Sequence, residues 1–161
     1  MDEIPTNCVM NKGITGCGAT TLAIEQQKPT IIAMPFVGLV ENKAEQHKNS
    51  VLGVYGSGDK TASIVEYLKT HEKLKIATTF DSLSKVCGIL MEQGIQVYEN
   101  THLVVDEWHI LFHAYLFRNN AVKDLLKECK KFQNVTFISA TPIEKEYWLK
   151  EMQDYREEVI K

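Results

Sequence analysis

Gly-Ile-Thr-Gly-Cys-Gly-Ala-Thr-Thr, residues 13–21, stands between a short apolar segment and an amphipathic one. A phosphate-binding loop has the pattern Gly, four residues, Gly, Lys, then Ser or Thr. Gly13, Gly18 and Thr20 occupy three of these positions, and Ala19 occupies the position of the lysine. We therefore expect a loop built for phosphate that lacks its most characteristic cation. An ordinary glycine-rich turn between a strand and a helix is the alternative.

The rest of the chain alternates short apolar segments with amphipathic ones. Strands are expected at 7–12, 30–34, 51–55, 75–79, 103–105 and 135–139. Helices are expected at 19–27, 37–48, 60–71, 82–92 and 120–132, at a stretch that starts at Glu107, and through the charged tail from Ile143. Continuous apolar strands alternating with helices indicate an α/β fold with a mainly parallel sheet and helices on both faces. We expect residues 1–161 to form a single domain.

Composition narrows the class of protein. The chain has 161 residues, of which 44% are hydrophobic, enough for one substantial core. Its net charge of −3 gives no overall attraction to nucleic acid, although a few local phosphate contacts suffice for binding. The four cysteines are far apart and never form Cys-x-x-Cys, which favours a reducing compartment over a disulfide framework. Apolar runs are too short to span a bilayer, so we expect a cytoplasmic protein with no membrane partner.

An acidic pair, Asp106-Glu107, ends the wholly apolar strand at 103–105. Ligands of parallel sheets bind beyond the carboxyl ends of the strands, so this pair and the glycine-rich loop are expected to face one cleft. There Thr20 and Asp106 would hold Mg²⁺, and Glu107 would orient or deprotonate an attacking water. An acidic pair is also common at the start of a helix, where it favours the helix dipole.

The sequence resembles the first RecA-like motor domain of a superfamily 2 helicase of the DExH type over nearly its whole length. Residues 13–21 are similar to motif I, Asp106-Glu107-Trp108-His109 to motif II, and Ser139-Ala140-Thr141 to motif III. Weaker similarities join residues 35–40 to motif Ia, 56–58 to a small glycine motif, and 78–83 to motif Ib. The resemblance implies a RecA-like three-layer sandwich, with ATP and Mg²⁺ as cofactors.

The resemblance also implies roles for individual residues. The nucleotide phosphates would be bound by Lys12, Gly13, Gly16, Cys17, Gly18, Ala19, Thr20 and Thr21. One nucleic-acid strand, DNA or RNA, would be contacted by Pro35, Phe36, Gly56, Thr79 and Ser82. The two sites would be coupled through His109, Ser139 and Thr141. Plainer alternatives are that Thr79 and Ser82 cap a helix, that 139–142 is a strand-end turn, and that Lys12 is a solvated lysine.

These features predict ATP-dependent unwinding or translocation of nucleic acid, with Glu107 and Asp106 as the catalytic pair. Helicases of this type hydrolyse ATP between two RecA-like domains, so the second domain would be supplied in cis or in trans. Because Ala19 cannot neutralise phosphate charge, the isolated chain is expected to be a weak or inactive ATPase. The alternative function is a catalytically inactive pseudo-ATPase that binds nucleic acid or protein. A P-loop phosphotransferase is a third interpretation, which the motif II and motif III residues disfavour.

Overall fold

The computed structural model describes residues 3–11, 18–111, 119–141 and 143–159. In this part of the chain, seven strands form one sheet in the order β3-β4-β2-β5-β6-β1-β7, and every paired neighbour is parallel. The strands are β1 (Cys8–Asn11), β2 (Thr30–Met34), β3 (Leu52–Val54), β4 (Lys75–Thr79), β5 (His102–Asp106), β6 (Asn134–Ser139) and β7 (Arg156–Val159). This confirms the expected α/β fold with a parallel sheet.

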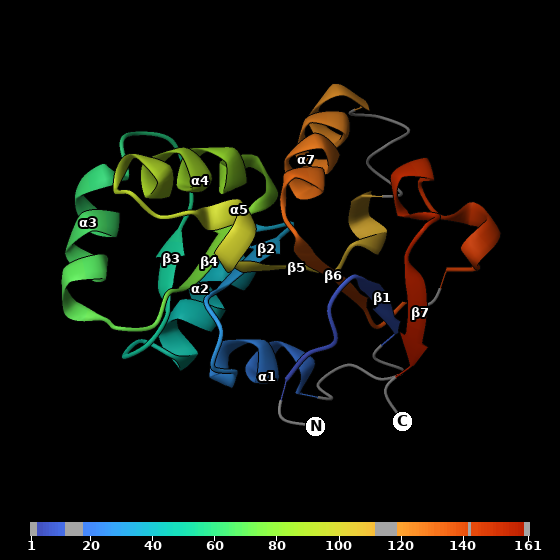
Figure 1. The fold of residues 1–161 in the computed structure, drawn as a ribbon, viewed down its shortest axis with the longest axis horizontal. Coiled ribbons are helices and arrows are strands. Elements are labelled where there is room, and N and C mark those ends of the chain that lie inside the picture. The colour runs from blue at the N-terminus through green and yellow to red at the C-terminus, as the bar shows by residue number, and fades with distance from the viewer. Residues whose placement is uncertain (1–2, 12–17, 112–118, 142, 160–161) are drawn as a thin grey trace.

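Helices cover both faces of the sheet (Figure 1). They are α1 (Ala19–Glu25), α2 (Val37–Gln46), α3 (Thr61–Thr70), α4 (Leu83–Glu92), α5 (Val97–Asn100) and α7 (Asn119–Lys131). Short 3₁₀ turns lie at Phe80–Ser82, Lys145–Tyr147 and Lys150–Met152. Figure 1 shows α1 and α2 below the sheet, with α4, α5 and α7 above it. The three-layer arrangement expected from the sequence is therefore present.

In β1, β2, β4, β5 and β6, alternate side chains pack in two separate cores. On β2, Ile31 and Ala33 pack in the core under α3, α4 and α7, whereas Ile32 and Met34 pack in the core with α1 and α2. Successive side chains of a strand point to opposite faces, so a strand buried on both sides is apolar at most positions. That requirement explains why these segments have continuous apolar sequences instead of an alternating pattern.

The C-terminal segment differs from the sequence expectation. We predicted a helical tail from Ile143, but the structure has two short 3₁₀ turns followed by β7, which pairs in parallel with β1. Lys and Glu favour helix by intrinsic propensity, which is why the charged tail suggested one. β7 lies at the edge of the sheet, where charged residues such as Arg156 and Glu158 are tolerated and discourage pairing with other chains.

The amino ends of the strands are joined by buried polar side chains. His102 of β5 is 1% exposed; its Nδ1 lies 3.0 Å from Gln26 Nε2, and its Nε2 lies 2.8 Å from Thr136 Oγ1. Gln26 also accepts a hydrogen bond from the backbone N–H of Ile4, and Thr136 donates one to the carbonyl of Pro5. These bonds tie the N-terminal segment to the sheet at the edge opposite the candidate site.

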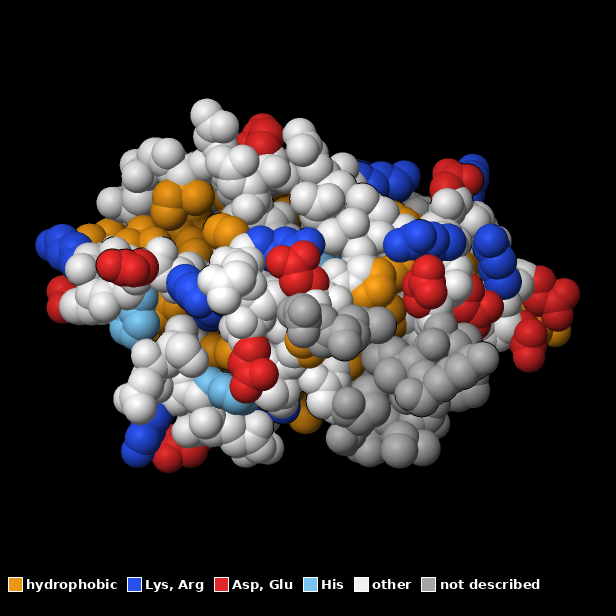
Figure 2. Space-filling model, turned by 60° about the horizontal axis from the view of Figure 1, so that its bottom comes forward, with side chains coloured by type: hydrophobic (Ala, Val, Ile, Leu, Met, Phe, Trp, Pro, Cys, Tyr) orange, Lys and Arg blue, Asp and Glu red, His pale blue; other side chains and the backbone are white. Residues whose placement is uncertain are grey.

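The same amino-terminal edge contains a surface hollow of about 810 Å³ between α3 and the segment that follows α4. Its apolar lining includes Val65, Leu68, Leu74 and Ile95. On the face shown in Figure 2, hydrophobic side chains gather at the left among charged and histidine side chains. Among the described residues, no helix is long and apolar enough to cross a membrane.

Candidate nucleotide and nucleic-acid site

Thr20 and Asp106 meet at the carboxyl edge of the sheet. Asp106 is the last residue of β5, and Thr20 lies in the first turn of α1. The Thr20 hydroxyl donates a hydrogen bond to Asp106 Oδ2 at 3.3 Å, and both side chains are buried. Gly18 precedes α1 with φ of +86°, a left-handed conformation that a residue with a Cβ adopts only under strain. The chain turn at Gly18 thus sets the direction in which α1 presents Thr20.

Glu107 has an unusual backbone conformation for a residue with a side chain. Its φ is +55°, and its backbone N–H donates to Asp106 Oδ1 at 3.0 Å. The next residue, Trp108, donates its backbone N–H to the carbonyl of Ile138 at 3.2 Å, which anchors the turn to β6. A left-handed conformation at a non-glycine residue costs on the order of 1–2 kcal/mol and is concentrated at functional sites. The expected helix from Glu107 begins only after this turn, at His109.

A hydrogen-bonded chain runs from the motif II residues to the motif III residues. His109 Nδ1 lies 2.7 Å from Ser139 Oγ and 3.7 Å from Glu107 Oε2. Ser139 Oγ accepts the backbone N–H of Thr141 at 3.0 Å and donates to the Thr141 carbonyl at 3.1 Å. The single hydroxyl proton of Ser139 is donated to the Thr141 carbonyl. In the hydrogen bond between His109 and Ser139, the donor is therefore the Nδ1–H of His109. The structure therefore brings together the three residues expected to couple the two sites.

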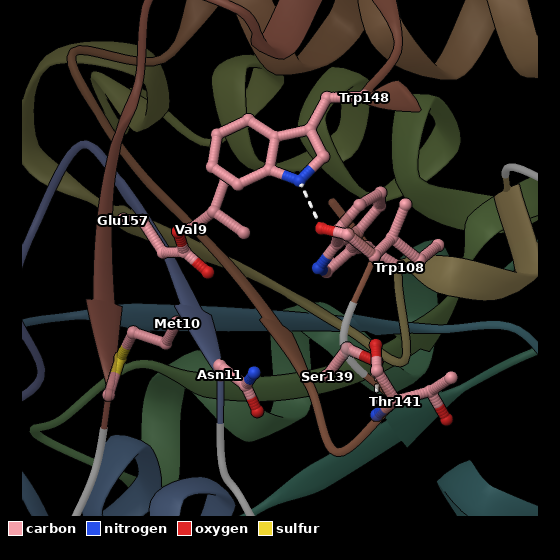
Figure 3. A pocket seen from close by; sticks show the side chains of 9 residues that line it. Val9, Met10, Asn11, Trp108, Ser139, Thr141, Trp148 and Glu157 are labelled. Atoms are coloured by element: carbon pink, nitrogen blue, oxygen red, sulfur yellow. Dashed lines mark hydrogen bonds between the residues drawn. The ribbon is translucent and has the colours of Figure 1, made fainter. Parts of the chain in front are cut away.

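Trp108 is buried next to these hydrogen-bonded residues. Its side chain is 1% exposed and packs edge to face on Trp148, with ring centroids 6.1 Å apart. Trp148 donates its indole N–H to the Ile143 carbonyl at 2.8 Å, whereas Trp108 Nε1 has no partner among the described residues. Figure 3 shows the indole nitrogen of Trp108 turned toward a cavity of about 10 Å³ that Ser139 and Glu157 also line. A cavity of this size accommodates roughly one water molecule.

A groove of about 430 Å³ lies beyond the ends of β2, β3 and β4. All five residues that we expected to contact a nucleic-acid strand line this groove: Pro35, Phe36, Gly56, Thr79 and Ser82. Val37, Asp81 and Lys85 line it as well. Thr79 and Ser82 are buried at 6% and 5% exposure, whereas Phe36 is 57% exposed. Lys85 Nζ donates to the carbonyls of Gly56 and Gly58 at 3.4 and 3.1 Å, which ties the glycine turn to α4.

Two ten-residue helices begin at this groove. Phe36 is the N-cap of α2, and Ser82 is the N-cap of α4. Neither helix start has a side-chain capping hydrogen bond, and the first turn of α2 contains no acidic residue. The first N–H groups of α2 have no partner within the helix and attract anions, whereas α4 continues directly from the 3₁₀ turn at Phe80–Ser82. The groove also carries one carboxylate, Asp81, and one ammonium, Lys85, so its side chains provide little net charge.

The groove and the Thr20–Asp106 cluster are neighbours because β2 pairs with β5. Ala33 is level with Val105, so Pro35 and Phe36 follow β2 just beyond the level of Asp106 on the adjacent strand. Adjacent strands lie about 4.8 Å apart. The two groups of residues expected from the sequence therefore share one edge of the sheet.

Part of the predicted phosphate-binding loop falls outside the described residues, namely Lys12, Gly13, Gly16 and Cys17. Of the described residues of this loop, Thr21 is half-buried and Ala19 is 4% exposed. Ala19 packs in the core formed by α1, α2 and the sheet, with Met10 and Ala23 among the members of that cluster. Within the described ranges, no group of three or more His, Cys, Asp or Glu side chains is arranged to hold a metal ion.

Sequence reasoning assigned no role to Val37, Asp81 or Lys85, and it did not foresee the left-handed backbone of Glu107. Val37 and Asp81 lie within the stretches that resemble motifs Ia and Ib, which was the only signal for them. The position of Lys85 depends on the first turn of α4 reaching the glycine turn. No sequence pattern specified that contact.

No protein-family model matches the chain, and no curated protein matches it in sequence. The fold is similar to a solved structure described as the DUF1998 helicase MrfA bound to DNA and AMPPNP. The TM-score is 0.57 at 17% sequence identity, over 96% of this chain and 24% of the helicase chain. This chain thus spans about a quarter of the length of that helicase. The similarity shows that the fold is that of a helicase-like α/β domain.

Proposed function

We propose that the chain is the first motor domain of a DExH-type helicase, a RecA-like domain that binds a nucleotide with Mg²⁺ and one strand of nucleic acid. The contact between Thr20 and Asp106 supports this most strongly. It places the hydroxyl of the glycine-rich loop against the carboxylate of motif II, although 86 residues separate them. The similar helicase was solved with DNA and AMPPNP, which agrees with both ligands.

Thr20 and Asp106 fit a magnesium–nucleotide site. Mg²⁺ is usually held by one or two protein oxygen ligands together with substrate phosphates and water, so a larger protein cluster is not required. When bound, the ion would neutralise phosphate charge and stabilise the charge that develops during hydrolysis. Thr20 would offer its hydroxyl, Asp106 would hold the hydrated shell, and Glu107 would orient or deprotonate the attacking water.

His109, Ser139 and Thr141 would transmit the state of the nucleotide to the strand-binding groove. The hydrogen bond from His109 to Ser139 crosses from the end of β5 to the end of β6. His109 also lies 3.7 Å from the Glu107 carboxylate. A movement of Glu107 would therefore shift His109 and its hydrogen bond to Ser139. In the groove, the start of α2, which has no side-chain cap, would bind a phosphate of the strand, which positions the strand without reading its sequence.

Coupled binding tests this proposal. Anisotropy of a fluorescently labelled single strand would be titrated with the protein, with and without AMPPNP and Mg²⁺. We expect nucleotide to change the strand affinity, and Asp106→Asn to remove that change while leaving nucleotide-free strand binding intact. A strand affinity that is identical under all these conditions would oppose the motor function.

A pseudo-ATPase that serves as a nucleic-acid- or protein-binding module is the second candidate. The burial of Ala19 favours it, because a lysine at this position would have to leave the apolar core to reach phosphate. Ala19→Lys, with Ala19→Met as a control for side-chain size, separates the candidates in the presence of a second RecA-like domain. A rise in strand-stimulated hydrolysis in the lysine variant alone indicates that the other machinery is intact. No rise in either variant favours the binding module.

A further inference from the structure

Phe36 breaks two local rules at once. It is the N-cap of α2, a position where Ser, Thr, Asp and Asn are preferred because their side chains accept a hydrogen bond from the helix. It is also 57% exposed, so it does not fill the core. A residue that contributes neither a cap nor packing is expected where function imposes the choice.

The surroundings of Phe36 extend its apolar surface. Among the described residues, four large hydrophobic side chains are exposed: Phe36, Val37, Met91 and Tyr147. Phe36 and Val37 are adjacent in sequence, and both line the groove at the carboxyl edge of the sheet. The floor beneath them is polar, with Thr79 and Ser82, and the first turn of α2 continues with Gly38, where added side-chain atoms would meet nothing within 4 Å. The space directly beside Gly38, in the first turn of α2, is therefore open.

We propose that Phe36 is a stacking platform for an unpaired base, so that the groove selects single-stranded nucleic acid over duplex. The stacking platform rests on the proposed function, which assigns contacts with the phosphates of the nucleic-acid strand, and it adds a contact with a base. The face of the Phe36 ring would carry the base, and the helix start at Val37 and Gly38 would lie beside the neighbouring phosphate. Duplex bases are already stacked on each other and cannot reach such a platform, whereas single-strand binding proteins rely on aromatic stacking.

The charge of the groove supports stacking as a main source of affinity. Asp81 and Lys85 offset each other, and the Lys85 ammonium is already engaged with two carbonyls of the glycine turn. A site that relied on phosphate contacts alone would need several unpaired cations and would weaken steeply with salt. We therefore expect the salt dependence of strand binding to be shallow.

The test compares a labelled 15-nucleotide single strand with an abasic strand of the same length and with the corresponding duplex, for wild type and four variants. Wild type is expected to bind the normal strand roughly five- to a hundredfold more tightly than the abasic one, the range measured for stacking of one base. Phe36→Ala and Phe36→Leu would lose this preference, because neither has a ring. Phe36→Tyr would keep it. Phe36→Trp would add an exposed indole whose fluorescence the bound base quenches.

Stability gives an independent readout. Phe36→Ser places a preferred capping residue at the start of α2, so its melting temperature is expected to rise while its strand affinity falls. Equal binding of normal and abasic strands by wild type, with Phe36→Ala harmless, would overturn the stacking platform and leave the proposed function standing. Absence of binding to every strand, with the protein folded, would overturn both.

Discussion

The hydroxyl of Thr20 donates to Asp106 Oδ2 at 3.3 Å, which joins the start of α1 to the end of β5. Both residues are buried, and they come from segments that the sheet order places two strands apart, since β6 lies between β5 and β1. The end of the glycine-rich stretch and the acidic pair thus meet at Thr20 and Asp106, although each alone has an ordinary structural explanation.

Thr20→Val replaces the hydroxyl by a methyl group of similar shape. We expect nucleotide binding in the presence of Mg²⁺ to weaken about tenfold or more, and unfolding free energy to fall by about 1 kcal/mol for the lost hydrogen bond. Calorimetric titration and urea unfolding measure the two effects. Thr20→Ser keeps the hydroxyl and should bind like wild type. If the valine variant also binds normally, Thr20 does not participate in the site.

Glu107 offers a test in which stability and function change in opposite directions. Asn tolerates the left-handed conformation better than Glu, so Glu107→Asn is expected to raise unfolding free energy by about 0.5–1 kcal/mol. Any hydrolysis measured with a second domain present should be lost, because the carboxylate is gone. Glu107→Gln removes the charge without relieving the backbone, so it should lose activity with no gain in stability. A gain of equal size in both variants would contradict the strain explanation.

His109 and Ser139 are expected to act as one unit. In a double-mutant cycle of His109→Ala and Ser139→Ala, the coupling in unfolding free energy should be about 1 kcal/mol, the typical worth of one hydrogen bond. Each single variant should also reduce the effect of a bound strand on nucleotide affinity, because that effect is a coupling free energy between two sites. Nucleotide affinity measured with and without the strand reports it directly. If the two substitutions change the unfolding free energy additively, and the effect of the strand on nucleotide affinity stays the same, then His109 and Ser139 do not couple the two sites.

The pH dependence of stability follows from His102. Burial, followed by the charges of Lys28 and Lys75, lowers the pKa of this histidine from 6.5 to about 4. Above pH 6.5 the imidazole is neutral in the folded and the unfolded chain. Between 6.5 and about 4 the unfolded chain binds a proton that the folded chain does not, so stability falls as the pH falls and levels off below about 4. The full loss is of order 3 kcal/mol.

Urea unfolding of wild type and His102→Gln across this interval isolates the contribution of the histidine from that of other titrating groups. The glutamine variant should be less stable at neutral pH, because it disturbs the bonds to Gln26 and Thr136. The difference between the two proteins should shrink toward pH 4. A difference that stays constant would show that His102 is not held neutral in the folded chain.

Strands buried on both faces were the easiest elements to predict. β2 and β4 have the bounds expected from sequence, because apolar and β-branched side chains at nearly every position leave few other conformations. β7 was missed since an edge strand needs no apolar pattern, and α5 because four residues give no helical period. The starts of α1 and α2, at Ala19 and Val37, agree with the sequence expectation, although Gly18 and Phe36 precede them without side-chain caps.

The sequence predicted which residues lie near one another in the candidate site better than it predicted their conformations. Parallel strands bring their carboxyl ends to one edge, so the meeting of Thr20 with Asp106, and of Thr79 with Phe36, followed from topology. The left-handed backbone of Glu107 depends on how Trp108 is anchored to β6, and the exposure of Phe36 depends on the direction in which α2 leaves the sheet. Both are tertiary properties that no local pattern encodes.

Binding of AMPPNP in the presence of Mg²⁺ tests the central claim most directly. Calorimetric titration of the folded protein should give a dissociation constant of order 1 mM or tighter, and both omission of Mg²⁺ and Asp106→Asn should weaken it strongly. No binding at several millimolar nucleotide, with the protein folded as judged by circular dichroism, would contradict a nucleotide-binding motor domain.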